Sequence, residues 1–570
     1  MRSKIIDTTT DHEACNALVE VLFAKGVRNA VISPGSRNAP LIVAFARCES
    51  IKKYVVVDER SAAFIALGLA QQLHEPVAIV CTSGTALLNY APAVAEAYYQ
   101  QIPLIVISAD RPIEWIDQAD SQTLRQYNAL SNFVKRSYDI PARYCDDTLR
   151  WYINRTINDA MITALNGRKS PVHINVQLIE PLCGEMNKND ALPQRIIDYV
   201  NGNNQLTIDC LDALKCEILK AKKVLIVAGM CDKNERLNNA INYLSTLPNV
   251  VVLTESISNL HGSKLITTID RTLMAISKND RSNYAPDLLI TFGGALVTRM
   301  LKQFLRTNSA KRQWHVGVSE NTIDTLQSLT TRIDIKPHDF FQQIAEKIAI
   351  NEVITSNYSS IWHKIDEEAT ITHDKYVEVA EWCDLKAFSI ILPHIPNDYN
   401  LQLSNGTTIR YAQLFKSDNI RQSNCNRGVA GIDGATSTAL GASLAFDGVT
   451  LLITGDMSMS YDLSGLASQY NNPRFKLIVI CNGGGGIFRF LKGPSTLPEL
   501  EDYFEVSRDI PVKKYADAFG FDYYEANDET TLNAELKSFL SNRNRASILA
   551  VFTPAAINAE ILRGYFHRNK

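Results

Sequence analysis

Short apolar runs of about five residues recur along the 570-residue chain, and stretches with helical periodicity separate them. Runs such as LIVIS at 104–108 and KLIVIC at 476–481 are apolar at nearly every position, without an alternation of apolar and polar residues. Strands of this kind are buried on both faces, as in a parallel sheet that helices cover on each side. We therefore predict an α/β fold whose ligands bind beyond the carboxyl ends of the strands.

The candidate strands fall into three sets. They are Ala30–Ser33, Tyr54–Val57, Val77–Cys81, Leu104–Ser108 and Val172–Val176; then Val224–Val227, Val250–Leu253 and Leu288–Phe292; then Leu451–Thr454, Leu477–Cys481 and Ile548–Phe552. Residues 184–207, rich in Asn, Asp and Gly, indicate a linker, and the polar residues 351–382 indicate a helical connection. We predict three α/β domains, at about 1–183, 200–350 and 380–570, which suits roughly 100–200 residues per domain.

The composition argues against several classes of partner. A formal net charge of -3 provides no basic field for nucleic acid. The apolar runs are far shorter than the roughly 20 residues of a membrane-spanning helix, so we expect no integral membrane association. The polar start of the chain shows no apolar segment of a signal peptide. The eleven cysteines are scattered, without CxxC pairs, which is typical of reduced thiols and predicts a cytoplasmic protein.

Polar residues follow two strands of the third set. Gly455 and Asp456 end one strand, and Asn482 ends the next, followed by four glycines at 483–486. Carboxylate, amide and backbone carbonyl oxygens are hard donors that suit Mg²⁺ bound also to phosphate. Glycines allow close approach of the backbone to an anion, and the helix after Asp456 offers free N–H groups. Each piece alone is typical of an ordinary turn or a flexible loop.

Together these elements resemble the motif of thiamine-diphosphate enzymes, in which Gly-Asp is followed after an intervening segment by Asn. The family usually has two adjacent asparagines, and Cys481 takes the place of the first one here. The resemblance implies that Asp456, Asn482 and the carbonyl of Gly484 bind Mg²⁺ or Mn²⁺. The other cofactor contacts that it implies in this domain are Gly455, Ser458 and Ile487.

The first domain has an acid at a strand end. Glu59 opens the helix SAAFIALGLAQQL, and the macrodipole, which favours acids in a first turn, is a sufficient explanation of it in isolation. Its neighbours, TSGT at 82–85 and the helix that carries Asn89, resemble the pyrimidine-binding domain of thiamine-diphosphate enzymes. The resemblance implies that Glu59 is the catalytic residue, a buried glutamate that hydrogen-bonds a pyrimidine nitrogen and so promotes ylide formation. Thr82 and Asn89 are implied as cofactor contacts.

The segment VISPGSRNAPL at 31–41 indicates which family of thiamine-diphosphate enzymes the chain resembles. It is similar to the start of the 2-succinyl-5-enolpyruvyl-6-hydroxy-3-cyclohexene-1-carboxylate (SEPHCHC) synthase family, thiamine-dependent enzymes of menaquinone synthesis. DERSAAFIALGLA, CTSGTALLNYAPAVAEAYY, ISADRP, NRGVAGIDG and GDMSMSYDL match in the same order. The resemblance covers the first and third domains well, and it implies a thiamine-diphosphate-binding fold in both. It also implies decarboxylation of 2-oxoglutarate and addition of the resulting carbanion to isochorismate.

These substrates carry several carboxylates, which arginine binds in bidentate fashion. Arg37 and Arg111 each follow an apolar strand, although an ion pair at the surface is the alternative for any one arginine. The substrate-binding residues that the resemblance implies are Ser36, Arg37, Arg111, Gln122, Arg299, Asn405, Arg410, Arg427 and Phe488. Ile432 is implied as the apolar support of the bent cofactor. A core role is the alternative for Phe488.

Two positions depart from the family. Gly406 stands where the family has a serine, so a hydroxyl contact is missing or comes from Thr407. In the middle domain only Arg299 aligns with the basic residues of the family, with Lys302 as a substitute. In this superfamily the pyrimidine domain of one chain faces the diphosphate domain of another. We therefore expect a homodimer or homotetramer with active sites between chains.

These motifs disfavour three other classes of protein. An acetolactate synthase or a simple 2-oxoacid decarboxylase would share the thiamine site, but SPGSRN and the arginines suit dicarboxylates better than pyruvate. A dinucleotide-binding protein requires GxGxxG at the start of a helix and an acid roughly 20 residues later, and the GGGG run has neither. A catalytically silent relative is disfavoured because Glu59, Asp456 and Asn482 are intact.

Overall fold

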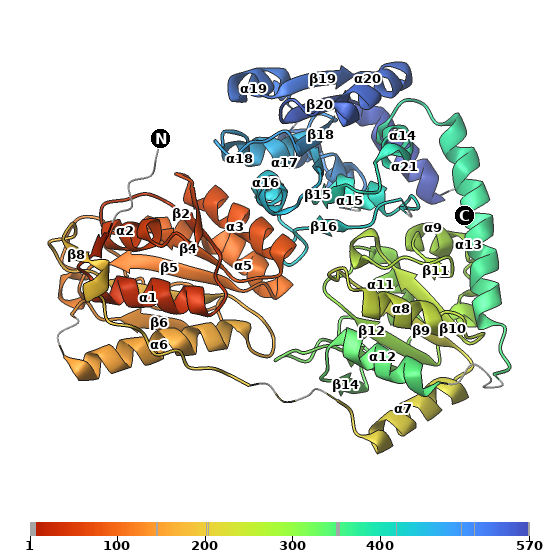
Figure 1. Cartoon of the computed structure of the whole chain (residues 1–570). Helices are drawn as coiled ribbons and strands as arrows, with labels where there is room; N and C mark the ends of the chain where they lie inside the picture. Colours follow the sequence, from red (N-terminus) through yellow and green to blue (C-terminus); the bar gives the residue numbers. More distant parts are fainter. Residues whose placement is uncertain are drawn as a thin grey trace. The chain divides into compact units, whose positions relative to one another are not determined.

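Three six-stranded sheets form the frame of the computed structural model, and every strand pair within them is parallel. Helices flank each sheet, so the predicted α/β class is confirmed (Figure 1). The structure describes residues 7–143, 146–200, 202, 205–348, 354–417, 419–491, 493–506 and 508–567. The chain divides into two compact units. The first consists of residues 1–201, 428–447 and 462–471, and the second of 202–427, 448–461 and 472–570.

The first sheet has the strand order β3-β2-β4-β5-β7-β6. Its strands are β2 (Asn29–Ile32), β3 (Lys52–Val55), β4 (Val77–Cys81), β5 (Leu104–Asp110), β6 (Ser137–Ile140) and β7 (Val172–Gln177). Its helices are α1 (Glu13–Ala24), α2 (Ala39–Arg47), α3 (Glu59–Leu73), α4 (Thr85–Asn89), α5 (Ala91–Gln100) and α6 (Asp147–Leu165). Side chains of α1, α2 and α6 share one buried cluster with the sheet, while α3 and α5 lie on its other side (Figure 1).

A two-stranded antiparallel sheet ties the start of the described chain to the end of the first domain. Strand β1 (Thr8–Thr10) pairs with β8 (Glu185–Asn187). Strand β8 and a 3-10 turn at Lys188–Asp190 lie inside residues 184–207, so the expectation of a plain linker there is wrong for its first part. Residues 201, 203 and 204 of that stretch lie outside the described residues.

Two helices from the later part of the chain complete the first unit, α16 (Ala435–Ala445) and α18 (Leu463–Leu466). Helix α16, with the sequence ATSTALGASLA, crosses α3 at very short range because both are rich in small residues. A Cβ atom on Gly68 would lie 1.9 Å from the carbonyl oxygen of Thr438, and one on Gly441 would lie 2.0 Å from that of Ile65. This close crossing holds α3, whose first residue is Glu59, against α16.

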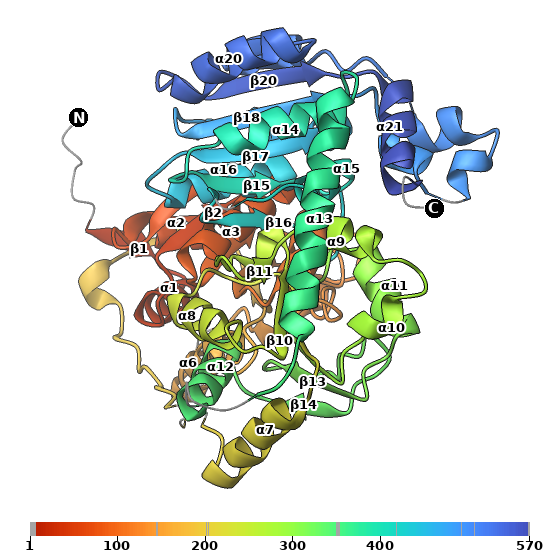
Figure 2. The same ribbon diagram turned by 90° about the vertical axis from the view of Figure 1, so that its right-hand side faces the viewer.

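The middle sheet has the order β11-β10-β9-β12-β13-β14. Its strands are β9 (Val224–Ala228), β10 (Val250–Thr254), β11 (Leu265–Ile266), β12 (Leu288–Phe292), β13 (Arg312–Val316) and β14 (Thr331–Ile333). Its helices are α7 (Ile208–Lys220), α8 (Glu235–Leu244), α9 (Ile269–Ala275), α10 (Arg281–Tyr284), α11 (Arg299–Thr307) and α12 (Pro337–Lys347). The predicted helical connection contains α13 (Tyr358–Val379), which packs against α9 and leads to the third sheet (Figure 2).

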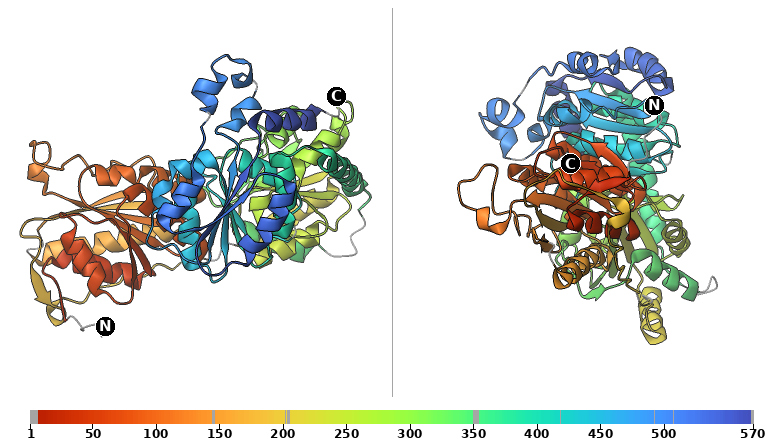
Figure 3. Two further views of the ribbon diagram at one scale, coloured as in Figure 1. Left: turned by 90° about the horizontal axis from the view of Figure 1, so that it is seen from above. Right: turned by 60° about the vertical axis from the view of Figure 1, so that its left-hand side comes forward.

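The third sheet has the order β16-β15-β17-β18-β20-β19. Its strands are β15 (Asn400–Leu403), β16 (Ser423–Cys425), β17 (Thr450–Gly455), β18 (Phe475–Cys481), β19 (Asp522–Ala526) and β20 (Ser547–Phe552). Its helices are α14 (Asp384–His394), α15 (Thr407–Ala412), α17 (Asp456–Tyr461), α19 (Val512–Phe519), α20 (Glu529–Ser541) and α21 (Ala555–His567). Short turns at Gly486–Arg489, Pro494–Thr496 and Leu500–Glu505 lie beside α21 (Figures 2 and 3).

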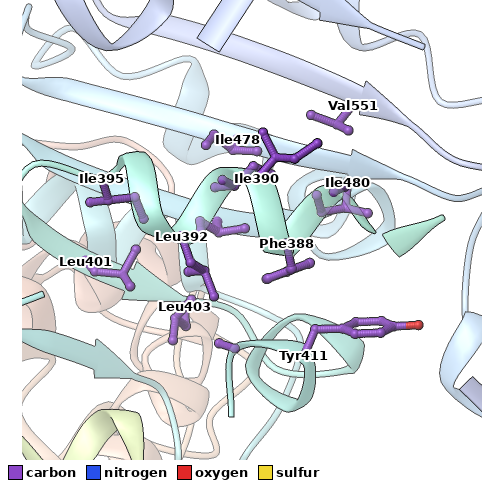
Figure 4. Packing of buried hydrophobic residues seen from close by; sticks show 14 of the residues in the cluster. Phe388, Ile390, Leu392, Ile395, Leu401, Leu403, Tyr411, Ile478, Ile480 and Val551 are labelled. Carbon is purple, nitrogen blue, oxygen red and sulfur yellow. The ribbon is translucent and has the colours of Figure 1, made fainter. Parts of the chain in front are cut away.

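Helix α14 is anchored in the core of the third sheet. Phe388 and Leu392 are each 1% exposed and pack toward β15 and β18 (Figure 4). The ring of Phe388 stacks on that of Tyr411, with 5.4 Å between their centroids. Burial of each such side chain contributes roughly 1.5–3 kcal/mol, so α14 is held firmly against the sheet.

The described residues contain neither a helix suited to span a membrane nor a disulfide bond. Helix α13 has 22 residues but carries many charged side chains. Among the described residues, no helix combines the length and the apolar composition that crossing a membrane requires. The cysteines in this part of the chain are free thiols.

Candidate active site

Four loops meet at the carboxyl edge of the first sheet because β3, β2, β4 and β5 are parallel neighbours. The loops after β2 and β5 carry Arg37 and Arg111. Those after β3 and β4 carry Glu59 and Thr82. The topology thus brings to one edge four residues that the sequence analysis predicted as the catalytic residue, a cofactor contact and two substrate-binding arginines.

Glu59 is the first residue of α3, but it is not the residue that caps this helix. Asp58 does so: its Oδ1 accepts a hydrogen bond from the backbone N–H of Ser61 at 3.1 Å, and its Oδ2 accepts one from the hydroxyl of Ser464 at 2.6 Å. Glu59 is half-buried, less than the buried glutamate expected, because it lies in the first turn at the open edge of the sheet. Since Asp58 already serves the helix end, the Glu59 carboxylate is available for another role.

Thr82 offers a buried hydroxyl at the end of β4. The residue is 5% exposed, and within the described chain its Oγ1 has no hydrogen-bond partner. Leaving such a group unpaired costs about 1–3 kcal/mol, so a polar ligand atom beside it would be favoured. Gly35 makes room for it, since a Cβ there would lie 2.4 Å from the Cβ of Thr82. Asn89 is instead exposed at the end of α4, and its amide donates to the carbonyl of Thr85 at 3.3 Å.

Both arginines of the first unit already have partners. Arg37 donates to the carbonyl of Leu178 at 3.2 Å and to Glu180 at 3.0 Å, while Ser36 beside it is exposed. The Glu180 side chain is 70% exposed, so this ion pair is weak and exchangeable for a substrate carboxylate. Arg111 pairs in the same way with Asp120, at 2.9 Å.

Two glutamines connect the segment after Arg111 to the loop after β4. The amide of Gln122 donates to the carbonyl of Ser83 at 3.1 Å, with a backbone φ of 54°. Gln126, 1% exposed, accepts a hydrogen bond from the backbone N–H of Gly84 at 2.7 Å and donates to Asn175 at 3.0 Å. The sequence analysis missed Gln126, although it lies in the same DSQTLRQ segment as Gln122.

Glu96 is a second residue that the sequence analysis missed. It is 3% exposed in α5, and its carboxylate accepts hydrogen bonds from the backbone N–H groups of Gly428 and Val429 at 2.5 Å and 2.7 Å. The loop that it holds leads to Ile432, which is 39% exposed. The available signal was an acid inside the apolar helix APAVAEAYYQ.

In the second unit, Asp456 and Asn482 end the adjacent strands β17 and β18 and are 3% and 6% exposed. The two loops are joined directly, since the backbone N–H of Gly483 donates to Oδ2 of Asp456 at 3.0 Å. The N–H of Met457 donates to Oδ1 at 2.6 Å. Burial raises the pKa of Asp456 to about 6, whereas these two hydrogen bonds favour the ionised form. The structure thus brings the two sequence-predicted side-chain ligands together.

The donor set at this edge suits a hard divalent cation. Among the described residues, no three His, Cys, Asp or Glu side chains gather in a way that could hold a metal ion. An Asp carboxylate and an Asn amide oxygen, completed by a carbonyl, phosphate oxygens and water, fit Mg²⁺ or Mn²⁺. Gly484 has φ +129°, and its carbonyl also accepts the N–H of Gly486 at 2.8 Å. A Cβ at Gly484 would lie 2.6 Å from the carbonyl oxygen of Glu505.

The other predicted cofactor contacts of this unit lie in the same loops. Gly455 ends β17, and a Cβ there would meet nothing within 4 Å, so the backbone is open to a ligand. Ser458 is buried in α17, and Ile487 is half-buried in the turn after the glycines. Phe488, next to it, is half-buried and lies 5.6 Å from the ring of Phe504, which fits both a pocket role and a packing role.

A basic cluster gathers in the second unit around Arg427. Its Nη1 donates to Oδ1 of Asn405 at 3.0 Å, and its buried Nε lacks a hydrogen-bond partner among the described residues. Burial, and next the charge of Arg427, lower the pKa of Arg410, and Arg299 adds to the effect. Lys302 donates to a backbone carbonyl at 3.1 Å. The carboxyl groups of Asp270 and Glu255 offset part of this positive charge. The unused N–H donor of Arg427 and the remaining positive charge favour an anionic ligand here.

Gly406, where the resemblance implies a serine, has a backbone conformation that favours glycine. Gly406 has φ +94°, a conformation that L side chains rarely adopt, although a Cβ there would meet nothing within 4 Å. The position therefore demands glycine in this chain, and Thr407 is the nearest hydroxyl in sequence.

Comparison with protein families assigns the class. A model described as "Thiamine pyrophosphate enzyme, N-terminal TPP binding domain" matches residues 12–129, and one described as "Middle domain of thiamine pyrophosphate" matches residues 198–380. Together with the strand-end carboxylates of the first and third sheets, these matches define a thiamine-diphosphate-dependent enzyme.

Relatives that match nearly the whole chain identify its family within this class of enzymes. Proteins named 2-succinyl-5-enolpyruvyl-6-hydroxy-3-cyclohexene-1-carboxylate synthase match over nearly the full length. That of Porphyromonas gingivalis is 42% identical over 98% of this chain and 97% of its own. That of Flavobacterium psychrophilum is 42% identical over 96% and 98%, and that of Bacteroides fragilis 34% over 97% and 98%. The chain therefore belongs to this synthase family, and the resemblance inferred from its motifs is confirmed.

Proposed function

We propose that the chain catalyses the reaction for which its relatives are named. As a transferase it decarboxylates 2-oxoglutarate and joins the resulting succinyl carbanion to isochorismate, giving SEPHCHC for menaquinone synthesis. The observation that carries this proposal is 42% identity over 98% of the chain to a synthase of that name. Activity of this kind requires the whole site: Asp456 and Asn482 directly follow β17 and β18, and Glu59 opens the helix after β3.

The residues of the chain have separate tasks in this proposal. Bound thiamine diphosphate supplies a nucleophilic carbon and an electron sink. Glu59 exchanges a proton with the pyrimidine ring, for which the capping role of Asp58 leaves it free. Asp456, Asn482 and the Gly484 carbonyl hold Mg²⁺ or Mn²⁺. The residues that contact the cofactor are Thr82, Asn89, Ile432, Gly455, Ser458 and Ile487.

Arginines bind the carboxylates of the two substrates. Arg427 has a buried N–H to offer, and Arg410 and Arg299 add charge beside it. In the first unit, Arg37 exchanges its exposed partner Glu180 for substrate, and Arg111 exchanges its half-buried partner Asp120. The remaining substrate contacts in the proposal are Ser36, Gln122, Asn405 and Phe488.

The assembly and the location of the enzyme are part of the same proposal. Because Glu59 and Asp456 belong to different compact units, and thiamine enzymes pair such domains between chains, we propose a homodimer or homotetramer with shared active sites. Scattered free cysteines favour a cytoplasmic location.

A coupled assay tests the proposal. Purified protein receives thiamine diphosphate, Mg²⁺, 2-oxoglutarate and isochorismate, and loss of isochorismate absorbance is followed. Glu59→Gln is expected to lower kcat by about 10²-fold or more, as loss of a proton-transfer group does. Glu49→Gln, at an exposed position, makes the same chemical change and should leave kcat unaltered. Turnover of pyruvate alone, or no consumption of isochorismate, would contradict the proposal.

A further inference from the structure

Asp384, which lies outside the motifs, stands directly behind the proposed metal ligand Asn482. It is the first residue of α14 and is 1% exposed. Its Oδ2 accepts a hydrogen bond from the side-chain amide of Asn482 at 2.9 Å. Its Oδ1 accepts hydrogen bonds from the hydroxyl of Thr553 at 2.6 Å and from the amide of Asn558 at 3.1 Å. The carboxylate is therefore held on both sides.

The surroundings make this carboxylate rigid. The backbone N–H of Asp384 donates to Oδ1 of Asn558 at 2.7 Å, and the amide of Asn558 also donates to Thr553 at 3.1 Å. The N–H of Thr553 in turn donates to the carbonyl of Cys481 at 3.1 Å, next to Asn482 itself. Since α14 is anchored in the core, Asp384 keeps its position when Asn482 takes up a ligand.

The chemistry of the pair decides the orientation of Asn482. Burial raises the pKa of the Asp384 carboxyl group, while the hydrogen bonds from Thr553, Asn482 and Asn558 favour its ionised form. An ionised carboxylate only accepts hydrogen bonds, so the NH₂ end of the amide must face Asp384. The two ends of an amide have almost the same shape, and packing alone would not distinguish them. The carbonyl oxygen of Asn482 consequently faces away from Asp384. Negative charge behind the NH₂ group also polarises the amide and increases the charge on its oxygen.

We infer that Asp384 is a positioning residue for the metal, which directs the amide oxygen of Asn482 at the cation and adds negative charge behind it. The inference rests on the proposed function, since it concerns the same metal site. In the described part of the chain, every hydrogen-bond partner of Asp384 is neutral. Asp456 lies close enough to feel its charge. A divalent cation is thus the natural counter-charge for two buried carboxylates at one sheet edge.

The test measures metal binding and not turnover. Metal-free protein with excess thiamine diphosphate is titrated with Mg²⁺ by tryptophan fluorescence and with Mn²⁺ by electron paramagnetic resonance. Asp384→Asn keeps the shape but removes the charge and the enforced orientation, and we expect half-saturation to need about tenfold more metal or above. The matched control is Asp366→Asn, which alters another buried carboxylate, 8% exposed, that accepts a threonine hydroxyl at 2.6 Å.

A second variant separates positioning from a merely structural role. Asp384→Asn/Asn482→Asp exchanges donor and acceptor with the total charge unchanged, and should recover most of the lost affinity. Asp384→Asn with metal affinity like that of Asp366→Asn, or a swap no better than Asp384→Asn, would overturn the inference. If metal-free Asp384→Asn does not fold, Thr553→Val decides: it removes one hydrogen bond from the carboxylate, and unchanged metal affinity refutes the inference. A wild-type protein that binds no metal would contradict the proposed function itself.

Discussion

The carboxylate of Glu96 accepts a 2.7 Å hydrogen bond from the backbone N–H of Val429. Gly428 donates to the same carboxylate, and so does the side chain of Gln100, each at 2.5 Å. Burial raises the pKa of the Glu96 carboxyl group, while these hydrogen bonds favour its ionised form. A buried acid of α5 thus secures the loop that leads to Ile432.

Glu96→Ala is expected to destabilise the protein and weaken its binding of thiamine diphosphate. The variant leaves two loop N–H groups unpaired, at about 1–3 kcal/mol for each one that stays buried. Glu96→Gln keeps one acceptor oxygen, so its stability and cofactor affinity should lie between those of the wild type and Glu96→Ala. Urea unfolding and cofactor titration measure the effects. Gln100→Leu, which removes a donor to Glu96 but no contact with the loop, is the control. Cofactor affinity that stays at the wild-type value in Glu96→Ala would contradict this role.

The close crossing of α3 and α16 predicts that a Gly→Ala substitution inside α3 destabilises the protein. Gly→Ala inside a helix ordinarily stabilises by roughly 0.5–1 kcal/mol. At Gly68, however, the new Cβ would lie 1.9 Å from the Thr438 carbonyl oxygen, so the helices must separate. Overpacking of this kind costs typically 1–3 kcal/mol, and we expect Gly68→Ala to lower the free energy of unfolding. Gly202→Ala, which would meet nothing within 4 Å, is the control. A stabilised Gly68→Ala would show that the crossing is looser than described.

The central strands could be predicted from the sequence because their burial makes them apolar throughout. Strand β15 was missed, since Asn400 and Gln402 are 0% and 3% exposed and yet polar. The edge strands β6 and β19 were missed because charged residues interrupt their apolar pattern. Where a strand has only one neighbour, apolar composition is a poor guide.

The site residues likewise divide into those that the sequence reveals and those that it does not. Glu59, Asp456 and Asn482 could be found because the end of a parallel strand is a position that sequence reveals. Their supporting residues could not. Asp384 lies 98 positions from Asn482, and Glu96 lies 333 positions from Val429. No local pattern records a hydrogen bond that forms only when distant segments fold together.

Gln126→Leu is expected to disturb the loop that carries Thr82. The buried glutamine accepts the N–H of Gly84 at 2.7 Å and donates to Asn175 at 3.0 Å, and leucine can do neither. Each group left unpaired costs about 1–3 kcal/mol, so unfolding should need less urea and the Kd for thiamine diphosphate should rise. Gln118→Leu, at an exposed position in the same segment, should change neither quantity. Equal behaviour of the two variants would exclude a supporting role for Gln126.

The buried carboxyl group of Asp110, beside Arg111, predicts how its contribution to the stability of the protein changes with pH. Burial raises the pKa of Asp110 to about 6, although hydrogen bonds from Asn175 and Arg111 and the charge of Arg37 favour the ionised form. The carboxylate of Asp139, which shares the amide of Asn175, opposes ionisation. The folded protein therefore carries a group that resists losing its proton.

Because this pKa exceeds the ordinary value of 3.8, the folded protein binds more protons than the unfolded chain between about pH 4 and pH 6. The contribution of Asp110 to the stability of the protein therefore falls as the pH rises through that window. Asp110→Asn removes the titrating group, so the free energy of unfolding of the variant relative to wild type should increase from pH 4 to pH 7. Urea unfolding of both proteins across this range measures the difference, in which titrations common to both cancel. Asp502→Asn, the same substitution at an exposed position, is the control. Parallel curves for Asp110→Asn and wild type would mean that Asp110 ionises as an ordinary surface acid does.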